Sequence, residues 1–199
     1  MPRIISFEGC IGAGKTTLTN YFSYELKCEK ILEAYEINPF LKDFYANSNV
    51  TFETEITFLL IHYSQLKKVI RECKGNFILS DFSIEKDLVY AQLNLNEKEL
   101  EIFEQLYNYA ISKVGVPYAV IYIDLSLNIL RRRIFQRGRP YEINADPVYF
   151  KEYNDKVKEY FRNYAHSKVF FFDVDDLDLD PNNKKLTQIR NKIIELMKE

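Results

Sequence analysis

The sequence is poor in residues that mark several classes of protein. It has no tryptophan, and its three cysteines, Cys10, Cys28 and Cys73, are odd in number and far apart. They form neither a disulfide framework nor a zinc-binding spacing, so a reducing cytoplasm is the expected location. No stretch approaches the ~18 consecutive apolar residues of a membrane-spanning helix, and residues 1–8 lack the features of a signal peptide. We therefore expect no membrane partner.

The sequence also lacks an excess of charge of one sign. Its 27 Lys and Arg residues stand against 29 Asp and Glu residues, which gives a formal net charge of −2. A domain that wraps a nucleic-acid polymer usually carries a basic excess, so no such polymer is expected as a partner. The 199 residues, 47% of them apolar, suffice for a single domain with a real core over residues 1–199.

Short apolar runs alternate with longer segments that have helical spacing. The predicted strands are residues 3–7, 30–33, 77–80, 118–124 and 169–174. The predicted helices are residues 16–27, 51–73, 86–93, 97–113, 127–137, 147–164 and 184–198. Strands separated by helices imply crossover connections and a parallel sheet. The runs 120–123 and 169–172 are apolar on both faces, as in strands covered by helices on each side. The predicted fold class is α/β with five parallel strands.

Three of the six glycines lie in one short motif. Residues 9–16 read Gly-Cys-Ile-Gly-Ala-Gly-Lys-Thr and match G-x-x-x-x-G-K-[ST] between a predicted strand and a predicted helix. Glycines let backbone N–H groups turn toward phosphate oxygens, and the helix N-terminus adds partial positive charge. Lys15 would bridge the β- and γ-phosphates, and Thr16 would ligate Mg²⁺. The motif predicts a site for a nucleoside triphosphate such as ATP, formed by Gly9, Cys10, Ile11, Gly12, Ala13, Gly14, Lys15, Thr16 and Thr17.

The remaining residues narrow the kind of nucleotide enzyme. The N-K-x-D and D-x-x-G motifs of GTPases are absent, whereas residues 131–139 hold five arginines. Arg133 and Arg137 are four residues apart and share one helical face, and Arg139 follows Gly138, which can end the helix. Guanidinium groups can stabilise a transferring phosphoryl group and exclude water. We expect an arginine lid at residues 131–145 and a small-molecule kinase.

Together these motifs resemble the deoxynucleoside kinase family of P-loop kinases, over roughly residues 3–165. The pattern is most similar to the bacterial deoxyguanosine kinase branch. The resemblance implies a five-stranded parallel sheet flanked by helices and, as is usual in the family, a homodimer. It rests on the phosphate loop, on Glu33 followed by residues 38–45 (Asn-Pro-Phe-Leu-Lys-Asp-Phe-Tyr), and on the segments 52–55 (Phe-Glu-Thr-Glu), 80–83 (Ser-Asp-Phe-Ser) and 137–142 (Arg-Gly-Arg-Pro-Tyr-Glu).

The resemblance implies roles at the phosphoryl end of the site. Glu33 matches the carboxylate that takes the proton of the substrate 5′-hydroxyl, with Glu36 as the competing candidate. Asp81 matches the strand-end acid that holds Mg²⁺ together with Thr16. The family usually has arginine after that acid, but this chain has Phe82. Lys86, one helical turn further on, is the candidate replacement for the missing cation.

The resemblance also implies how sugar and base are bound. Tyr45 and Glu142 match the pair that positions the sugar 3′-hydroxyl. Glu55 stands where the family has a base-reading glutamine, and a carboxylate offers only acceptors, which suits the adjacent N1–H and N2–H₂ donors of guanine. Asp87 matches a second base-contacting acid. His62 stands where relatives often have arginine, which puts the usual Arg–Asp pairing in doubt.

Phe58, Phe82 and Tyr90 are the unranked candidates for rings that enclose the base, and the resemblance implies that Asp175 and Asp176 border the adenine of the donor. The expected activity is ATP-dependent 5′-phosphorylation of a purine 2′-deoxynucleoside, deoxyguanosine first, as a step of nucleotide salvage. Three alternatives stay open. They are a deoxyadenosine or broad-specificity deoxynucleoside kinase, a nucleoside monophosphate kinase acting on dTMP, and a nucleotide-binding module without catalysis.

Overall fold

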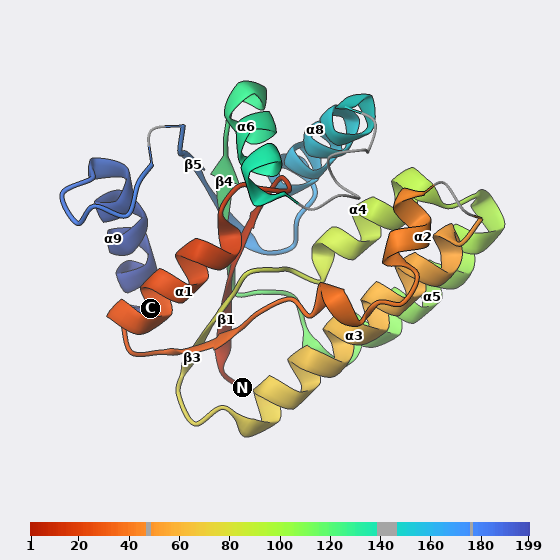
Figure 1. The fold of residues 1–199 in the computed structure, drawn as a ribbon. Coiled ribbons are helices and arrows are strands. Elements are labelled where there is room, and N and C mark those ends of the chain that lie inside the picture. Colours follow the sequence, from red (N-terminus) through yellow and green to blue (C-terminus); the bar gives the residue numbers. More distant parts are fainter. Residues whose placement is uncertain (47–48, 139–146, 176) are drawn as a thin grey trace.

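The computed structural model describes residues 1–46, 49–138, 147–175 and 177–199, and all side chains of these ranges except Leu127, Arg131 and residues 147–150. At its centre lies a sheet of five parallel strands in the order β2-β3-β1-β4-β5 (Figure 1). The predicted α/β class and five-stranded parallel sheet are confirmed. The strands are β1 (Arg3–Gly9), β2 (Glu29–Ile31), β3 (Phe77–Ser80), β4 (Ala119–Asp124) and β5 (Lys168–Asp173).

The helices follow the predicted segments with small shifts at their ends. The bounds of α6 and α9 are those predicted. The short helices η1 and α2 were not predicted, because segments of three and five residues are too short to display helical periodicity. The helices are α1 (Lys15–Glu25), η1 (Tyr35–Ile37), α2 (Leu41–Tyr45), α3 (Thr51–Glu72), α4 (Glu85–Asn94), α5 (Glu97–Val114), α6 (Leu127–Arg137), α8 (Pro147–Asn163) and α9 (Lys184–Lys198).

Helices cover the sheet on both faces (Figure 1). On one face Phe7 of β1 packs with Phe22 of α1 and Ile189 of α9. On the other face Ile78 of β3 packs against α3, α4 and α5, and Tyr122 of β4 packs against α8. Each such apolar side chain contributes roughly 1.5–3 kcal/mol when fully buried. Among the described residues, no helix has both the length and the apolar character needed to cross a membrane.

The two strands expected to be covered on both faces differ in their exposure. Residues 119–123 of β4 are buried, as predicted for a central strand. In β5 no residue reaches full burial, and Phe171 is 36% exposed although it contacts Tyr122. The reason is position, because β5 pairs only with β4 and forms an edge of the sheet. An apolar run on both faces therefore did not distinguish a central strand from an edge strand.

The order of the strands places a crevice at their carboxyl ends. β1 and β3 are neighbours, but α1 leaves β1 to cover one face while α4 and α5 leave β3 to cover the other. In parallel α/β sheets, ligands bind where successive connections diverge in this way. The loop after β1 and the residues after β3 therefore flank the expected site.

Candidate active site

The loop after β1 has the backbone conformation that its glycines permit. Gly9, Gly12 and Gly14 have φ values of 141°, 84° and 97°. A Cβ atom at Gly9 would lie 2.3 Å from the carbonyl oxygen of Ile123 on β4, so this position tolerates no side chain. Lys15 Nζ donates to the carbonyl oxygens of Gly9 and Cys10 at 2.9 and 3.1 Å. The loop thus holds the lysine at the start of α1, as the motif predicts.

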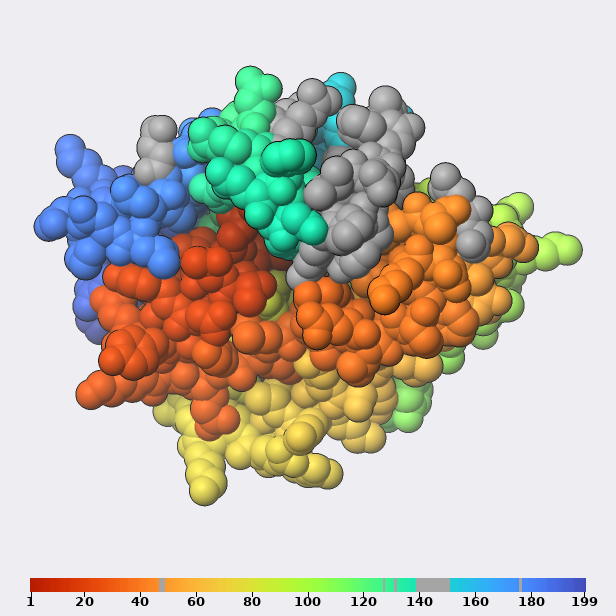
Figure 2. All heavy atoms as spheres, in the orientation of Figure 1, coloured from red at the N-terminus to blue at the C-terminus, as the bar shows by residue number. Residues whose placement is uncertain are grey.

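A cavity of about 720 Å³ opens beside this loop and extends toward α3 and α4. It is within the size range of small-molecule sites. Segments from the first quarter of the chain, in red and orange, adjoin on the face shown in Figure 2. Of the residues predicted to bind nucleotide or substrate, the cavity is lined by Ile11, Gly12, Ala13, Gly14, Lys15, Thr16, Thr17, Glu33, Tyr45, Glu55, Phe58, Asp81, Lys86, Asp87, Tyr90, Arg133 and Arg137.

Two lid arginines belong to the phosphoryl end of the cavity. Arg133 Nη1 donates to the carbonyl oxygen of Ala13 at 2.9 Å, so α6 lies over the phosphate loop. Arg137 lines the cavity at the end of α6, where Gly138 takes the left-handed conformation at φ 69°. Two further predicted residues, Arg139 and Glu142, lie outside the described residues.

Asp81, directly after β3, contacts both the phosphate loop and the loop after β2. Its Oδ2 accepts from Thr16 Oγ1 at 2.5 Å, and its Oδ1 accepts from the backbone N–H of Glu33 at 2.7 Å. Thr16 and Asp81 therefore present hard oxygen donors to one point, and such donors suit Mg²⁺ when phosphates and water complete the octahedron. The residues present fit a magnesium site of this kind, which the sequence predicted from the same pair.

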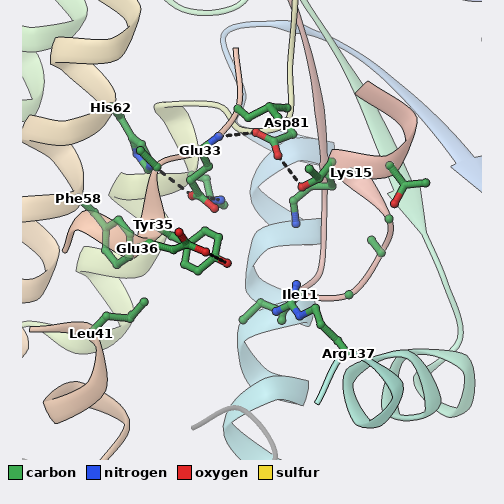
Figure 3. A pocket seen from close by; sticks show the side chains of 18 of the residues that line it. Ile11, Lys15, Glu33, Tyr35, Glu36, Leu41, Phe58, His62, Asp81 and Arg137 are labelled. Carbon is green, nitrogen blue, oxygen red and sulfur yellow. Dashed lines mark hydrogen bonds and ion pairs between the residues drawn. The ribbon is translucent and has the colours of Figure 1, made fainter. Parts of the chain in front are cut away.

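Glu33 lies two residues beyond β2 and beside two cationic groups (Figure 3). Lys86 Nζ and His62 Nε2 lie 3.3 and 3.2 Å from its Oε1. Burial alone would raise the pKa of Glu33, but the positive charges of Lys86 and His62 outweigh burial and hold the pKa below its ordinary value of 4.5. Glu33 is thus an ionised carboxylate next to the magnesium-type ligands.

Glu36, the competing acid, also lines the cavity but has a different setting. It is exposed, and its Oε1 accepts a hydrogen bond from the hydroxyl of Tyr35 at 2.8 Å (Figure 3). Glu33, in contrast, is tied through its own backbone to Asp81. The geometry favours Glu33 over Glu36 as the group that meets an acceptor hydroxyl.

Buried acids form the far end of the cavity. Glu55 on α3 is 4% exposed, and its Oε1 accepts from Asn94 Nδ2 at 2.7 Å. Burial, with a smaller effect of the nearby Asp87, raises the pKa of Glu55 to about 8, although the Asn94 hydrogen bond opposes the rise. Sequence analysis treated Glu55 as ionised and missed Asn94. Asn94 lies seven residues after Asp87, hence on the same face of α4, which is a signal that could have found it.

Two further predicted residues lie elsewhere than expected. Phe82 is fully buried and does not line the cavity; it stacks on His62 with ring centroids 4.4 Å apart and so supports the cavity wall from behind. Asp175 accepts from the backbone N–H of Ser126 at 2.7 Å and holds the start of α6 instead of lining the cavity. Asp176 lies outside the described residues. From the same acidic loop, the residues that do line the cavity are Leu177, Asp178 and Leu179.

The cavity lining also includes residues that sequence analysis did not single out. Tyr35 and Ile37 belong to η1, and Leu41 and Phe44 belong to α2. Ile37, Leu41 and Phe44 are apolar and carry no chemical group that marks a site in the sequence. Gly9 and Cys10 do not line the cavity, but their carbonyl groups accept from Lys15.

Comparison with known sequences places the chain among nucleoside-modifying enzymes. A family model described as "Deoxynucleoside kinase" matches residues 5–198. Deoxyguanosine kinase of Bacillus subtilis (strain 168) is 39% identical over 85 residues, which cover 41% of this chain and 41% of the relative. Deoxyadenosine/deoxycytidine kinase of the same strain is 34% identical over 76 residues, which cover 38% and 35%. The matched part of the chain therefore spans about two fifths of the length of these relatives or less.

Comparison with solved structures extends the similarity to almost the whole chain. The structure of deoxyadenosine kinase from M. mycoides with the products dCMP and a flexible dCDP has a TM-score of 0.79 at 25% identity, covering 96% of this chain and 99% of that chain. The structure of the same enzyme with bound dATP has a TM-score of 0.80 at the same identity and coverage. The fold is thus the one that these kinases share.

Proposed function

We propose that this chain, which belongs to the deoxynucleoside kinase family, transfers the γ-phosphoryl group of ATP to the 5′-hydroxyl of a purine 2′-deoxynucleoside. Deoxyguanosine is the proposed preferred acceptor, and nucleotide salvage the proposed role. One observation carries the proposal. A single cavity joins a phosphate loop, the ionised Glu33 and the buried acid Glu55, in that order along its length.

At the phosphoryl end, positioning and charge do most of the chemistry. Glu33 accepts a hydrogen bond from the 5′-hydroxyl, orients its oxygen toward the γ-phosphorus and takes its proton. Phosphoryl transfer passes through a loose transition state that demands little basicity, so the lowered pKa of Glu33 is compatible with this role. Lys15, Arg133 and Arg137 neutralise the transferring oxygens, and Arg139 is proposed to join them. Thr16 and Asp81 would hold Mg²⁺, which would supply further neutralisation of the phosphates.

At the base end, Glu55 and Asp87 are proposed to select the acceptor. Ionised Glu55 can accept both the N1–H and the N2–H₂ donors of guanine. Tyr45 is proposed to contact the sugar with Glu142, Phe58 to pack on the base ring and Asp87 to receive a polar base edge. All the described members of this group line the cavity.

Deoxyadenosine is the second candidate acceptor, and one observation favours it. With a pKa of about 8, Glu55 is protonated at neutral pH. A neutral carboxyl presents one donor and one acceptor, which suits adenine as a glutamine amide would. The M. mycoides relative is a deoxyadenosine kinase, which also supports this candidate. The dTMP alternative is disfavoured, because an acceptor phosphate needs cationic partners and residues 33–55 contain no arginine.

The deciding assay offers purified protein and ATP·Mg²⁺ with deoxyguanosine, deoxyadenosine, deoxycytidine, thymidine and dTMP, one at a time. The proposal requires a monophosphate product, with the highest kcat/KM for deoxyguanosine above about pH 8, where Glu55 is ionised. If no nucleoside is phosphorylated, the kinase proposal fails. Preference for deoxyadenosine would reject only the assignment of guanine, and preference for dTMP would establish the monophosphate kinase instead.

Lys86 is proposed to supply the cation that the family usually places after the strand-end acid. It is 5% exposed and pairs with Glu33 at 3.3 Å. Replacing Lys86 with alanine is expected to lower kcat about ten- to hundredfold, since a hydrogen bond to a charged group contributes ~1.5–3 kcal/mol. Steady-state kinetics measure the loss, Lys86→Arg should restore most of it, and thermal unfolding checks the fold. Unchanged turnover of Lys86→Ala would contradict this role.

We also propose that the chain forms a homodimer in the cytoplasm. The three free cysteines fit a reducing location. Support for the dimer comes from an exposed apolar surface on α3 and α5, formed by Leu60, Ile102, Leu106 and Tyr109. Ile102, Leu106 and Tyr109 share one face of α5 by their spacing. Contiguous apolar surface of this kind marks protein interfaces.

Sedimentation analysis tests the dimer. The wild-type protein is expected at about twice its chain mass of 23.7 kDa, and Ile102→Lys is expected to shift it toward the monomer by placing a charge in the interface. Tyr24→Lys is the matched control, because Tyr24 is 88% exposed on α1, on the opposite face of the sheet. A wild-type monomer at micromolar concentration would reject the dimer.

A further inference from the structure

His62 lies where the two ends of the cavity meet. It is 1% exposed in the middle of α3 and lines the cavity. Its Nδ1 lies 2.8 Å from Asp87 Oδ2, on the base side. Its Nε2 lies 3.2 Å from Glu33 Oε1, on the phosphoryl side, and the dashed line in Figure 3 marks this contact. One ring therefore connects the proposed base-reading acid to the proposed catalytic carboxylate.

The two carboxylates decide the protonation state of the ring. A neutral imidazole has one N–H and one lone pair. With Nδ1 donating to Asp87, a neutral ring would turn the Nε2 lone pair toward the ionised carboxylate of Glu33. Repulsion of this kind is costly in a buried site. Only the imidazolium form places positive charge against both carboxylates, with Nδ1 hydrogen-bonded to Asp87 and Nε2 at ion-pair distance from Glu33 but outside hydrogen-bond geometry.

The surroundings of the ring favour the same form. The charged groups that face it are Glu33 after β2, Lys86 and Asp87 on α4, and Glu55 on its own helix α3. Burial lowers the pKa of His62, but the charge of Asp87, followed by the contact with Glu33, outweighs burial and raises the pKa to about 9. The stacked ring of Phe82 fixes the plane of the imidazole.

We propose that His62, as an imidazolium, is a positioning residue that holds Oε1 of Glu33 and leaves Oε2 for the acceptor hydroxyl. Lys86 binds the same oxygen, so both cationic contacts of Glu33 among the described residues are to Oε1. The inference rests on the proposed function, because it assigns His62 a role through Glu33. It also links the base end to the phosphoryl end, since any change at Asp87 alters the charge of the ring that is ion-paired with Glu33.

This role predicts an alkaline limit of turnover. His62 has a raised pKa, so its cationic contact with Glu33 is complete below the ordinary value of 6.5 and in the neutral range, and it is lost as the pH rises through about 9. Turnover at saturating acceptor should therefore fall above about pH 9. The titration of Glu55 is removed by measuring in the Glu55→Gln background with saturating deoxyadenosine. Lys86 stays charged over this range. Burial lowers its pKa, but the negative charge of Glu33 outweighs burial and raises the pKa above the ordinary value.

The kinetic test compares the only two histidines of the chain. His62→Gln keeps one N–H donor without the charge, and is expected to lower kcat about ten- to hundredfold, to leave the acceptor KM within about threefold, and to abolish the alkaline limit near pH 9. His166→Gln is the matched control, since His166 is exposed, and should behave as wild type. A kcat of His62→Gln within twofold of wild type, or an alkaline limit that persists in it, overturns the inference.

A second measurement does not depend on the variant folding. Nitrogen-15 NMR of the imidazole groups should show His62 with two protonated ring nitrogens at pH 7. The His62 signal should titrate together with the loss of kcat. A neutral His62 at pH 7, or a titration apart from the kinetic limit, overturns the proposal. Absence of nucleoside phosphorylation by the wild type overturns the proposed function, which the nucleoside panel distinguishes from a failure at His62.

Discussion

Replacement of Glu33 by glutamine is expected to lower kcat by about 10²- to 10⁴-fold, the range that a positioned general base contributes. The amide keeps the size of the side chain and can still contact the acceptor hydroxyl, but it cannot take its proton. The acceptor KM should therefore change by no more than about threefold, because the loss occurs in the transition state. Steady-state kinetics with deoxyguanosine separate the two parameters.

Glu36→Gln is the matched control for this variant. Glu36 lines the same cavity but is exposed and bonded to Tyr35, so its amide variant should keep near wild-type kcat. The opposite ranking, with Glu36→Gln impaired and Glu33→Gln active, would transfer the role to Glu36. Thermal unfolding of both variants is needed as well, since Glu33→Gln leaves the cations Lys86 and His62 without their shared carboxylate.

The acid side of the pH profile tests the same group. The pKa of Glu33 lies below its ordinary value of 4.5, because Lys86 and His62 outweigh the effect of burial. A carboxylate with a lowered pKa stays ionised as the pH falls and is protonated only below that value. Turnover should therefore show no loss attributable to Glu33 between pH 7 and pH 4.5. A loss centred above pH 5 that Glu33→Gln abolishes would contradict this assignment.

Replacement of Glu55 by glutamine is expected to reverse the order of the purine acceptors. The ratio of kcat/KM for deoxyguanosine to that for deoxyadenosine should fall about hundredfold or more, since each unpaired buried polar group costs ~1–3 kcal/mol. The amide sets a donor against one of the two guanine donors, whereas it pairs with adenine. Competition between the two acceptors in one reaction measures the ratio directly. Glu53→Gln, an exposed neighbour on α3, is the control and should leave the ratio unchanged.

The same selectivity should depend on pH in the wild type. Burial raises the pKa of Glu55 to about 8, so the side chain is neutral below this value and ionised above it. Guanine requires the ionised form and adenine the neutral form, so the deoxyguanosine to deoxyadenosine ratio should rise with pH and level off above about 8. In Glu55→Gln the ratio should be flat. A flat ratio in the wild type would show that the ionisation of Glu55 does not determine the preference between the two purines.

Asn94 provides a further check on this pH dependence. Its amide donates to Glu55 Oε1 and favours the ionised form. Removing that donor in Asn94→Leu should move the midpoint of the selectivity change to higher pH. A midpoint that moves to lower pH would mean that the amide favours the neutral carboxyl instead.

Local chemistry was readable without tertiary structure. The phosphate loop, the end of α6 at Gly138 and the bounds of β3 depend on spacing and on backbone conformations that neighbouring residues set among themselves. The resemblance to one family could be assigned for the same reason, because its motifs are short and contiguous. Helix periodicity likewise located the long helices, since a buried face repeats every three to four residues.

What only the tertiary structure decided concerns contacts between segments far apart in the chain. Asn94 reaches Glu55 across 39 residues, His62 joins Glu33 to Asp87, and Phe82 turns behind His62 rather than toward the cavity. Burial and opposing charge move the pKa of Glu55 and of Glu33 in opposite directions, although the two residues are the same amino acid. The sequence by itself therefore determined which groups are present and where the long helices that carry many of them lie. Folding decided their protonation and their partners, because both depend on the dielectric and on the charges that packing brings together.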